Sequence, residues 1–139
     1  MTTTGVRTFD HSLETTREWL HDVQEQMGLD DEQRAFRVTR AVLQTLRDRL
    51  TVEEAAEFAA QLPMLLQGVY YHGWTPNNKP EKIRHRDEFL NKVAEGLMQE
   101  HDPAEACRTV FGVCEERMPG GEVEDVKGIL PEPIRELWP

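Results

Sequence analysis

The sequence contains a single serine, Ser12, and no glycine-rich nucleotide-binding motif. Ser12 is not part of a G-x-S-x-G motif, which excludes the nucleophile turn of many serine hydrolases. Neither G-x-x-x-x-G-K-S/T nor G-x-G-x-x-G occurs, so the backbone loops that commonly bind nucleotide phosphates are missing as well. Few familiar catalytic sets remain. We therefore expect a protein that is not an enzyme, with no catalytic residues and no cofactor.

Long apolar runs are also absent. No stretch approaches the roughly 18 apolar residues that a membrane-spanning helix requires. The first residues, MTTTGVRTFDHSL, do not contain the apolar core of a signal peptide. We therefore expect a soluble, cytoplasmic protein that does not associate with a membrane.

The chain has only two cysteines, Cys107 and Cys114. They lie two helical turns apart on an expected helix, which separates their Cα atoms by about 10 Å. That separation is too long for a disulfide bond between them. We interpret both as small core side chains in a reducing compartment.

Positive charge is scarce outside one short segment. The formal net charge is −10, with 16 Lys and Arg against 26 Asp and Glu. Residues 75–86, TPNNKPEKIRHR, carry four basic side chains and only one acidic side chain. Non-specific nucleic-acid binding depends on clustered Lys and Arg that neutralise phosphates. The acidic body of the chain therefore indicates no nucleic-acid partner.

The sequence repeats itself. The segment from Ser12 to Tyr70 matches the segment from Lys82 to Trp138 in the order of its apolar positions. A constant offset pairs Leu43 with Phe111, Glu54 with Glu122, Leu62-Pro63 with Leu130-Pro131, and Tyr70 with Trp138. Two copies of a segment usually form two like units packed around one core. We expect one domain, residues 1–139, with repeat one at about 12–70, a connector at about 71–86 and repeat two at about 82–138.

Apolar residues recur at helical spacing in both repeats, and no segment alternates as a strand does. We expect three principal helices in each repeat, about six in all. Thr51 followed by Glu54 predicts a capping box, in which each side chain satisfies a backbone N–H of the other residue. The Leu-Pro element near the end of each repeat predicts a break and a short extra helix, because proline lacks a backbone N–H. The expected fold class is all-α, a compact helical bundle.

One of these helices is expected at about residues 32–50, with its apolar side chains on one face. The apolar face comprises Ala35, Val42, Leu43, Leu46 and Leu50. The polar side chains of the helix are expected to point away from the core. They are Arg37, Arg40, Gln44, Arg47 and Asp48.

A specific motif, LP…YY.GW.P….P, lies in the run LPMLLQGVYYHGWTPNNKPEKIRHRDEFLNKVAEGL. The run is preceded by VLQTLRDRLTVEEAAEFAAQ, and the chain closes with LPEPIRELWP. In these segments the chain resembles the bacterial family catalogued as domain of unknown function 2267, over about residues 11–138. The resemblance implies a small helical protein with no established activity, substrate or cofactor, and it supplies no catalytic residues.

One helix face offers a set of possible metal ligands. His11, Glu14, Glu18 and His21 recur at helical spacing, and Glu18 with His21 has the Glu-x-x-His spacing found in di-metal helical bundles. The position in repeat two that corresponds to His21 is Asn91, so the second such pair is missing. We therefore interpret the stripe as a solvated helix face and assign no metal ligands.

The connector has an unusual composition for a linker. From Tyr70 to Arg86 it contains three aromatic residues, two prolines and four Lys or Arg side chains. These side chains can simply cover the core and pair with the acidic body. Aromatic rings and arginines on a stiff loop are also typical of recognition surfaces. The candidate interaction surface comprises Tyr71, His72, Trp74, Lys79, Lys82, Arg84 and Arg86.

Three functional hypotheses follow. The leading one is a non-catalytic helical interaction module, which uses the connector and the adjacent Leu-Pro corner to contact a protein partner or a second copy of itself. The alternative is a site for a small anionic or apolar ligand between the two repeats, where a pseudo-two-fold axis tends to leave a cleft. A metal-dependent enzyme is the second alternative, and the incomplete ligand set argues against it.

Overall fold

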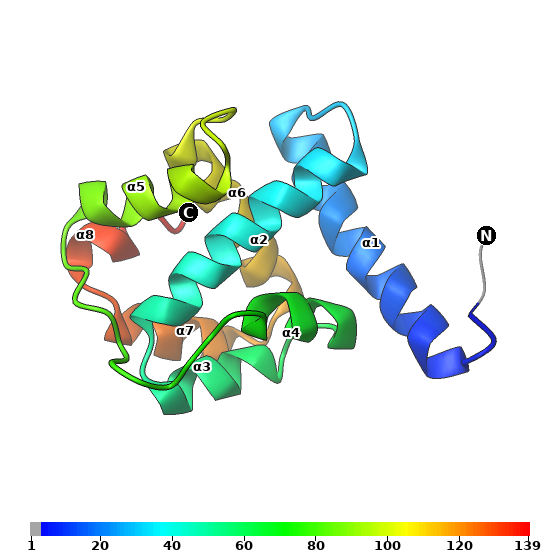
Figure 1. Cartoon of the computed structure of the whole chain (residues 1–139), viewed down its shortest axis with the longest axis horizontal. Coiled ribbons are helices and arrows are strands. Elements are labelled where there is room, and N and C mark those ends of the chain that lie inside the picture. The colour runs from blue at the N-terminus through cyan, green and yellow to red at the C-terminus, as the bar shows by residue number, and fades with distance from the viewer. Residues whose placement is uncertain (1–3) are drawn as a thin grey trace.

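Between residues 4 and 139, the part of the chain that the computed structural model describes, the protein forms eight α-helices and no β-strand. The all-α fold class is therefore confirmed. The eight helices include α4 and α8, which follow the two Leu-Pro elements where short extra helices were expected. The division into six principal and two short helices is not confirmed, because α4 is as long as α3. Figure 1 shows the arrangement. The helices are α1 (Arg7–Met27), α2 (Glu32–Arg49), α3 (Val52–Ala59), α4 (Met64–Tyr71), α5 (Arg86–Gly96), α6 (Pro103–Arg117), α7 (Gly120–Ile129) and α8 (Glu132–Arg135).

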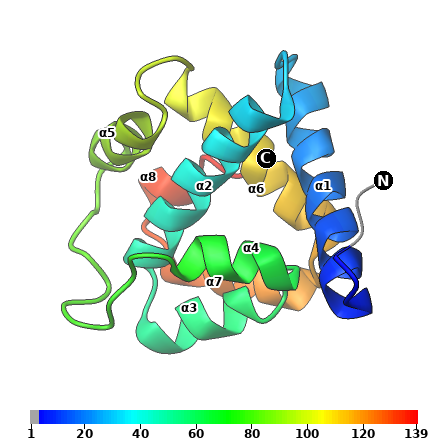
Figure 2. The same cartoon turned by 45° about the vertical axis from the view of Figure 1, so that its right-hand side comes forward.

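Helix α2 lies at the centre and packs against α1, α4, α5 and α6 (Figures 1 and 2). The expectation that its polar side chains all point away from the core is wrong for two of them. Arg47 is only 6% exposed, and the side chain of Asp48 is 15% exposed. Helix α4 and the connector cover this part of α2, so the helix is enclosed on more than its apolar face. Arg40 remains exposed, as expected.

Helix α3 begins with half of the expected capping box. The hydroxyl oxygen of Thr51 accepts a hydrogen bond from the backbone N–H of Glu54 at 3.1 Å. Among the described residues the reciprocal bond, from the backbone N–H of Thr51 to the Glu54 carboxylate, is not formed, and Oε1 of Glu54 is buried with no hydrogen-bond partner. The prediction of a full capping box is therefore wrong. The Glu54 side chain instead points into the contact between α3 and α7, a placement that no local pattern reveals.

Both Leu-Pro elements interrupt the chain as expected. Helix α3 ends at Ala59 and α4 begins directly after Pro63; α7 ends at Ile129 and α8 begins directly after Pro131. The break after α3 folds α4 back, so that the Tyr70 hydroxyl donates to the carbonyl of Ala55 at 2.9 Å. Tyr70 is fully buried and also stacks on Phe58. This corner fixes the direction in which α4 runs toward α1.

The cysteines are confirmed as core residues. Cys107 and Cys114 are both buried and free. Burial away from water raises the pKa of each thiol to about 12, so neither is a reactive thiolate at neutral pH. Among the described residues, no helix combines the length and the apolar content needed to cross a bilayer.

Candidate functional site

The connector is fastened to the C-terminal end of α2. One guanidinium nitrogen of Arg47, Nη1, donates to the carbonyl oxygens of Tyr70 at 2.6 Å and His72 at 2.8 Å. These carbonyls lie at the end of α4, where no further helical turn supplies donors. Farther along, Arg49 donates to the carbonyl of Ile83. The connector is therefore held by buried and partly buried hydrogen bonds from α2 rather than only by its prolines.

The structure brings some of the candidate connector residues together and separates others. Tyr71 and Trp74 pack against each other with ring centroids 5.7 Å apart, and both rings border the core. The Lys79 side chain is 7% exposed and lies within ion-pair distance of Asp48. The remaining four candidates make no such shared cluster. Of these, His72, Lys82 and Arg84 are exposed and Arg86 is half-buried. Whether they contact a partner stays a prediction.

A second candidate surface is an apolar groove between α1 and α4. Its volume is about 390 Å³, and nearly all of its lining is carbon. Phe9 is 53% exposed, Met64 55% and Leu65 43%. Figure 2 shows one end of α4 lying against the N-terminal part of α1. The groove is lined by Thr4, Phe9, Ser12, Leu13, Met64, Leu65 and Gly68.

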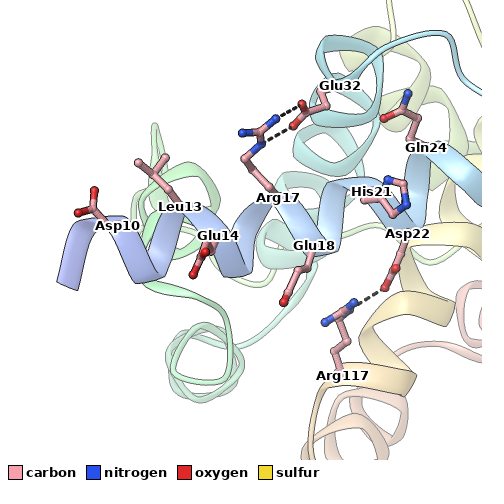
Figure 3. Close-up of a pocket in the computed structure, with 10 residues that line it drawn as sticks. All are labelled: Asp10, Leu13, Glu14, Arg17, Glu18, His21, Asp22, Gln24, Glu32 and Arg117. Atoms are coloured by element: carbon pink, nitrogen blue, oxygen red, sulfur yellow. Dashed lines mark hydrogen bonds and ion pairs between the residues drawn. The ribbon is translucent and has the colours of Figure 1, made fainter. Parts of the chain in front are cut away.

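The adjoining face of α1 is charged (Figure 3). Arg17 forms a two-point hydrogen bond with Glu32, at 2.6 and 3.0 Å, and this contact lowers the pKa of the Glu32 carboxyl. Glu14 and Glu18 point to the opposite side of the helix in Figure 3. In the structure over residues 4–139 neither carboxylate forms an ion pair. Glu14 and Glu18 therefore carry uncompensated negative charge on a side of α1 that points away from Leu13, the residue that this face shares with the groove (Figure 3).

The stripe of possible metal ligands on α1 is solvated, as interpreted from the sequence. His11, Glu14, Glu18 and His21 are all exposed. The nearest charged contact of His21 is Glu25, one turn along the same helix, at 3.4 Å. The four side chains do not gather around a common point, so the geometry favours no metal there.

A different set of carboxylates does converge, where α3 contacts α7. One oxygen each of Glu54, Glu122 and Asp125 lie within 4.8 Å of one another, and Glu54 is only 8% exposed. Burial, followed by the nearby Glu122 and Glu57 carboxyls, raises the pKa of Glu54 to about 8. Burial also raises the pKa of Glu122. These residues could hold a cation or share a proton.

Sequence reasoning missed both the groove and this carboxylate cluster. The aligned pair of Glu54 and Glu122 is visible in the repeat, but acidic residues are so common in this chain that a solvated face is their ordinary interpretation. A useful signal is the second acidic pair at the same offset, Glu57 and Asp125. The groove leaves no such signal, because Phe9 and Met64 look like ordinary core residues.

Comparison with known families agrees with the resemblance noted from the sequence. The family model described as "Uncharacterized conserved protein (DUF2267)" matches residues 16–137, which is most of the chain. The chain belongs to this family. No curated protein matches the sequence. The family description names no activity, so function has to be argued from the surfaces described above.

Proposed function

We propose that this protein is a non-catalytic helical interaction module whose contact surface is the apolar groove between α1 and α4. The observation that carries the proposal is the gathering of exposed apolar side chains. Phe9, Met64 and Leu65 account for three of the six exposed large hydrophobic residues in the described part of the chain, and all three line this one groove. Scattered apolar residues are normal on a surface, but a shared apolar groove marks a binding site.

The partner that fits best is a basic amphipathic helix. An apolar helix face fits a groove between helices, with anchors spaced at i, i+3, i+4 and i+7. Leu13 belongs both to the apolar groove and to the charged face of α1 beside it. That face contributes Asp10, Glu14 and Glu18, together with Arg17, which is paired with Glu32. Lys and Arg beside the apolar anchors of a partner would be attracted by Asp10, whose carboxylate accepts from the backbone N–H of the groove residue Thr4, and by the net charge of −10, which would repel an acidic partner.

A pair of designed helical peptides tests the proposal. One has leucines at i, i+3, i+4 and i+7 with lysines elsewhere, and the other has glutamates in place of the lysines. Fluorescence anisotropy should show saturable binding of the lysine peptide and at least tenfold weaker binding of the glutamate peptide. The double variant Phe9→Ser, Met64→Ser should lose the binding.

Met98→Ser is the matched control. Met98 is 68% exposed, more than any other large apolar side chain in the described residues, and lies outside the groove, just after α5. This variant should bind the lysine peptide as the wild type does. Equal binding by the groove variant and the wild type would contradict the proposal, because the peptide would then be held elsewhere by charge alone.

The repeat architecture is part of the proposal. We infer an internal duplication in which α1 to α4 correspond to α5 to α8. Each half has two longer helices followed by two shorter ones, and the two Leu-Pro corners lie at equivalent positions, which supports this inference. Helix α3 also packs against α7, its counterpart in the second repeat. The connector as a further contact surface, a ligand site between the repeats and a cytoplasmic location remain predictions from the sequence.

A further inference from the structure

Two pairs of acidic residues face each other where α3 contacts α7. Helix α3 provides Glu54 and Glu57, and α7 provides Glu122 and Asp125. The spacing is i, i+3 in both helices, which places each pair on one helix face. The inferred duplication makes Glu54 equivalent to Glu122 and Glu57 equivalent to Asp125, at one common offset. Carboxylates that are equivalent in the two repeats therefore meet across their contact.

The buried members of this cluster lack a positive partner. Glu54 is 8% exposed, and its Oε1 has no hydrogen-bond donor; Oε1 of Glu122 is likewise buried without one. Within residues 4–139, no Lys, Arg or His forms an ion pair with any of the four carboxylates. A buried carboxylate with neither a donor nor a counter-charge is strongly unfavourable. The buried Glu54 carboxylate, which has an oxygen within 4.8 Å of Glu122 and Asp125, therefore needs either a bound cation or a proton to neutralise it.

We propose that Glu54, Glu122 and Asp125 bind one hard divalent cation, with Ca²⁺ as the best fit. Carboxylate oxygens are the ligands that such cations prefer. Oxygens on opposite sides of a Ca²⁺ ion are about 4.6–5.2 Å apart, twice the usual Ca–O distance. The three carboxylate oxygens lie within 4.8 Å of one another, so they can surround Ca²⁺ with little movement. Mg²⁺, with Mg–O distances of about 2.0–2.1 Å, requires the helices to close further.

The three proposed ligands differ in their exposure to solvent, which leaves room for water ligands. Glu54 is buried and Glu122 half-buried, whereas Asp125 is exposed, so the cluster opens to solvent on one side. Water can supply the additional oxygens that Ca²⁺ takes in its shell of about 6–8 ligands, a range typical of this ion. The bound ion would link α3 to α7 and thereby join the two halves of the chain. This site is separate from the proposed peptide groove, and either proposal can fail without the other.

Calcium titration of the full chain is the direct test. The protein is treated with EDTA, transferred to chelator-free buffer at pH 7.5 and titrated with CaCl₂ in a calorimeter. One saturable site per chain is expected, with Kd at or below the range of about 10⁻⁴–10⁻³ M found for weak calcium modules. Ca²⁺ should also raise Tm. Terbium luminescence gives a second readout, because the hydroxyl of Tyr70, a ring able to sensitise Tb³⁺, bonds the carbonyl of Ala55, directly after Glu54.

Isosteric variants locate the ion. Glu54→Gln and Glu122→Gln remove charge but keep side-chain volume, so they should fold and should bind Ca²⁺ at least tenfold more weakly. Glu53→Gln is the matched control, since Glu53 is the exposed neighbour on the same helix, and it should bind as the wild type does. Absence of saturable Ca²⁺ binding, or equal binding by the Glu54 variant, would overturn the proposal. A Tm that responds to pH but not to Ca²⁺ would also overturn it, because a shared proton would then neutralise the pair.

Discussion

The hydroxyl oxygen of Ser12, in α1, accepts a hydrogen bond from the backbone N–H of Leu65, in α4, at 2.8 Å. Leu65 is in the first turn of α4, where backbone N–H groups have no partner within the helix. The residue before α4 is Pro63, whose side chain cannot cap these groups. The only serine of the chain therefore caps a helix that is distant in sequence, and it ties together the two walls of the apolar groove.

Replacement of Ser12 by alanine should weaken this connection. The expected loss of unfolding free energy is about 1 kcal/mol, the usual effect of removing a helix cap. Amide hydrogen exchange at Leu65 should become faster, because its donor loses a buried acceptor. Thr15→Ala is the control, since the Thr15 hydroxyl bonds only to the carbonyl of His11 in the same helix. Equal exchange rates at Leu65 in the two variants would show that Ser12 does not hold α4.

Arg47→Met should destabilise the protein far more than a surface arginine variant does. Methionine fills most of the space but cannot donate to the carbonyls of Tyr70 and His72, which accept from Arg47 in a buried setting. We expect a loss of about 2–4 kcal/mol in urea unfolding, because hydrogen bonds from a buried charged donor are lost and two carbonyls lose their partner. Arg40→Met, at an exposed position of the same helix, should change stability by less than about 0.5 kcal/mol.

Arg47 also shows which features of the structure can be predicted from the sequence and which cannot. Local patterns predicted the all-α class, the breaks at Pro63 and Pro131 and the burial of the cysteines, because helical periodicity and the missing proline N–H act over a few residues. They could not predict that Arg47 is buried. That outcome depends on α4 and the connector folding over α2, and a polar residue opposite an apolar face gives no local sign of being covered by a later segment.

The candidate sites are harder to predict for the same reason. The exposure of Phe9 and Met64 depends on how α1 and α4 are placed relative to each other in the fold. Their apolar side chains alone would predict that both residues are buried in the core. The sequence predicts a capping role for Glu54 because Thr51 precedes it by three positions. The structure keeps the Thr51 cap and turns the Glu54 carboxylate toward α7, so tertiary contact overrides the local motif.

Gly96→Ala should test the close packing of α5 on α2. A Cβ atom at Gly96 would lie 2.8 Å from the Cβ of Ala41, well inside van der Waals contact. Forcing the helices apart should cost about 1–3 kcal/mol, the usual effect of overpacking. The double variant Gly96→Ala, Ala41→Gly exchanges the methyl group between the helices and should recover part of the loss. Additive losses in the double variant would mean that backbone entropy, rather than the contact, makes the glycine necessary.

Stability of the cation-free protein should decrease as pH rises from about 5 to 8. Burial, followed by the facing carboxyls of Glu122 and Glu57, raises the pKa of Glu54 from the usual 4.5 to about 8. Asp125 faces the same cluster and helps to raise the pKa of Glu122. Below pH 4.5 the group is protonated in both states and causes no loss. Between 4.5 and 8 the folded protein keeps a proton that the unfolded chain releases, so each pH unit lowers the unfolding free energy by at most about 1.4 kcal/mol. Above pH 8 the loss is complete.

Urea unfolding at several pH values, with EDTA present, measures this slope. Glu54→Gln should flatten it and should be more stable than the wild type at pH 8, because an amide carries no charge into the contact between α3 and α7. Glu53→Gln should keep the wild-type slope, since Glu53 is exposed. A wild-type stability that rises between pH 5 and 8 would contradict the prediction, because the Glu54 carboxylate would then be stabilised by a positive group in the folded chain instead of destabilised by its acidic neighbours.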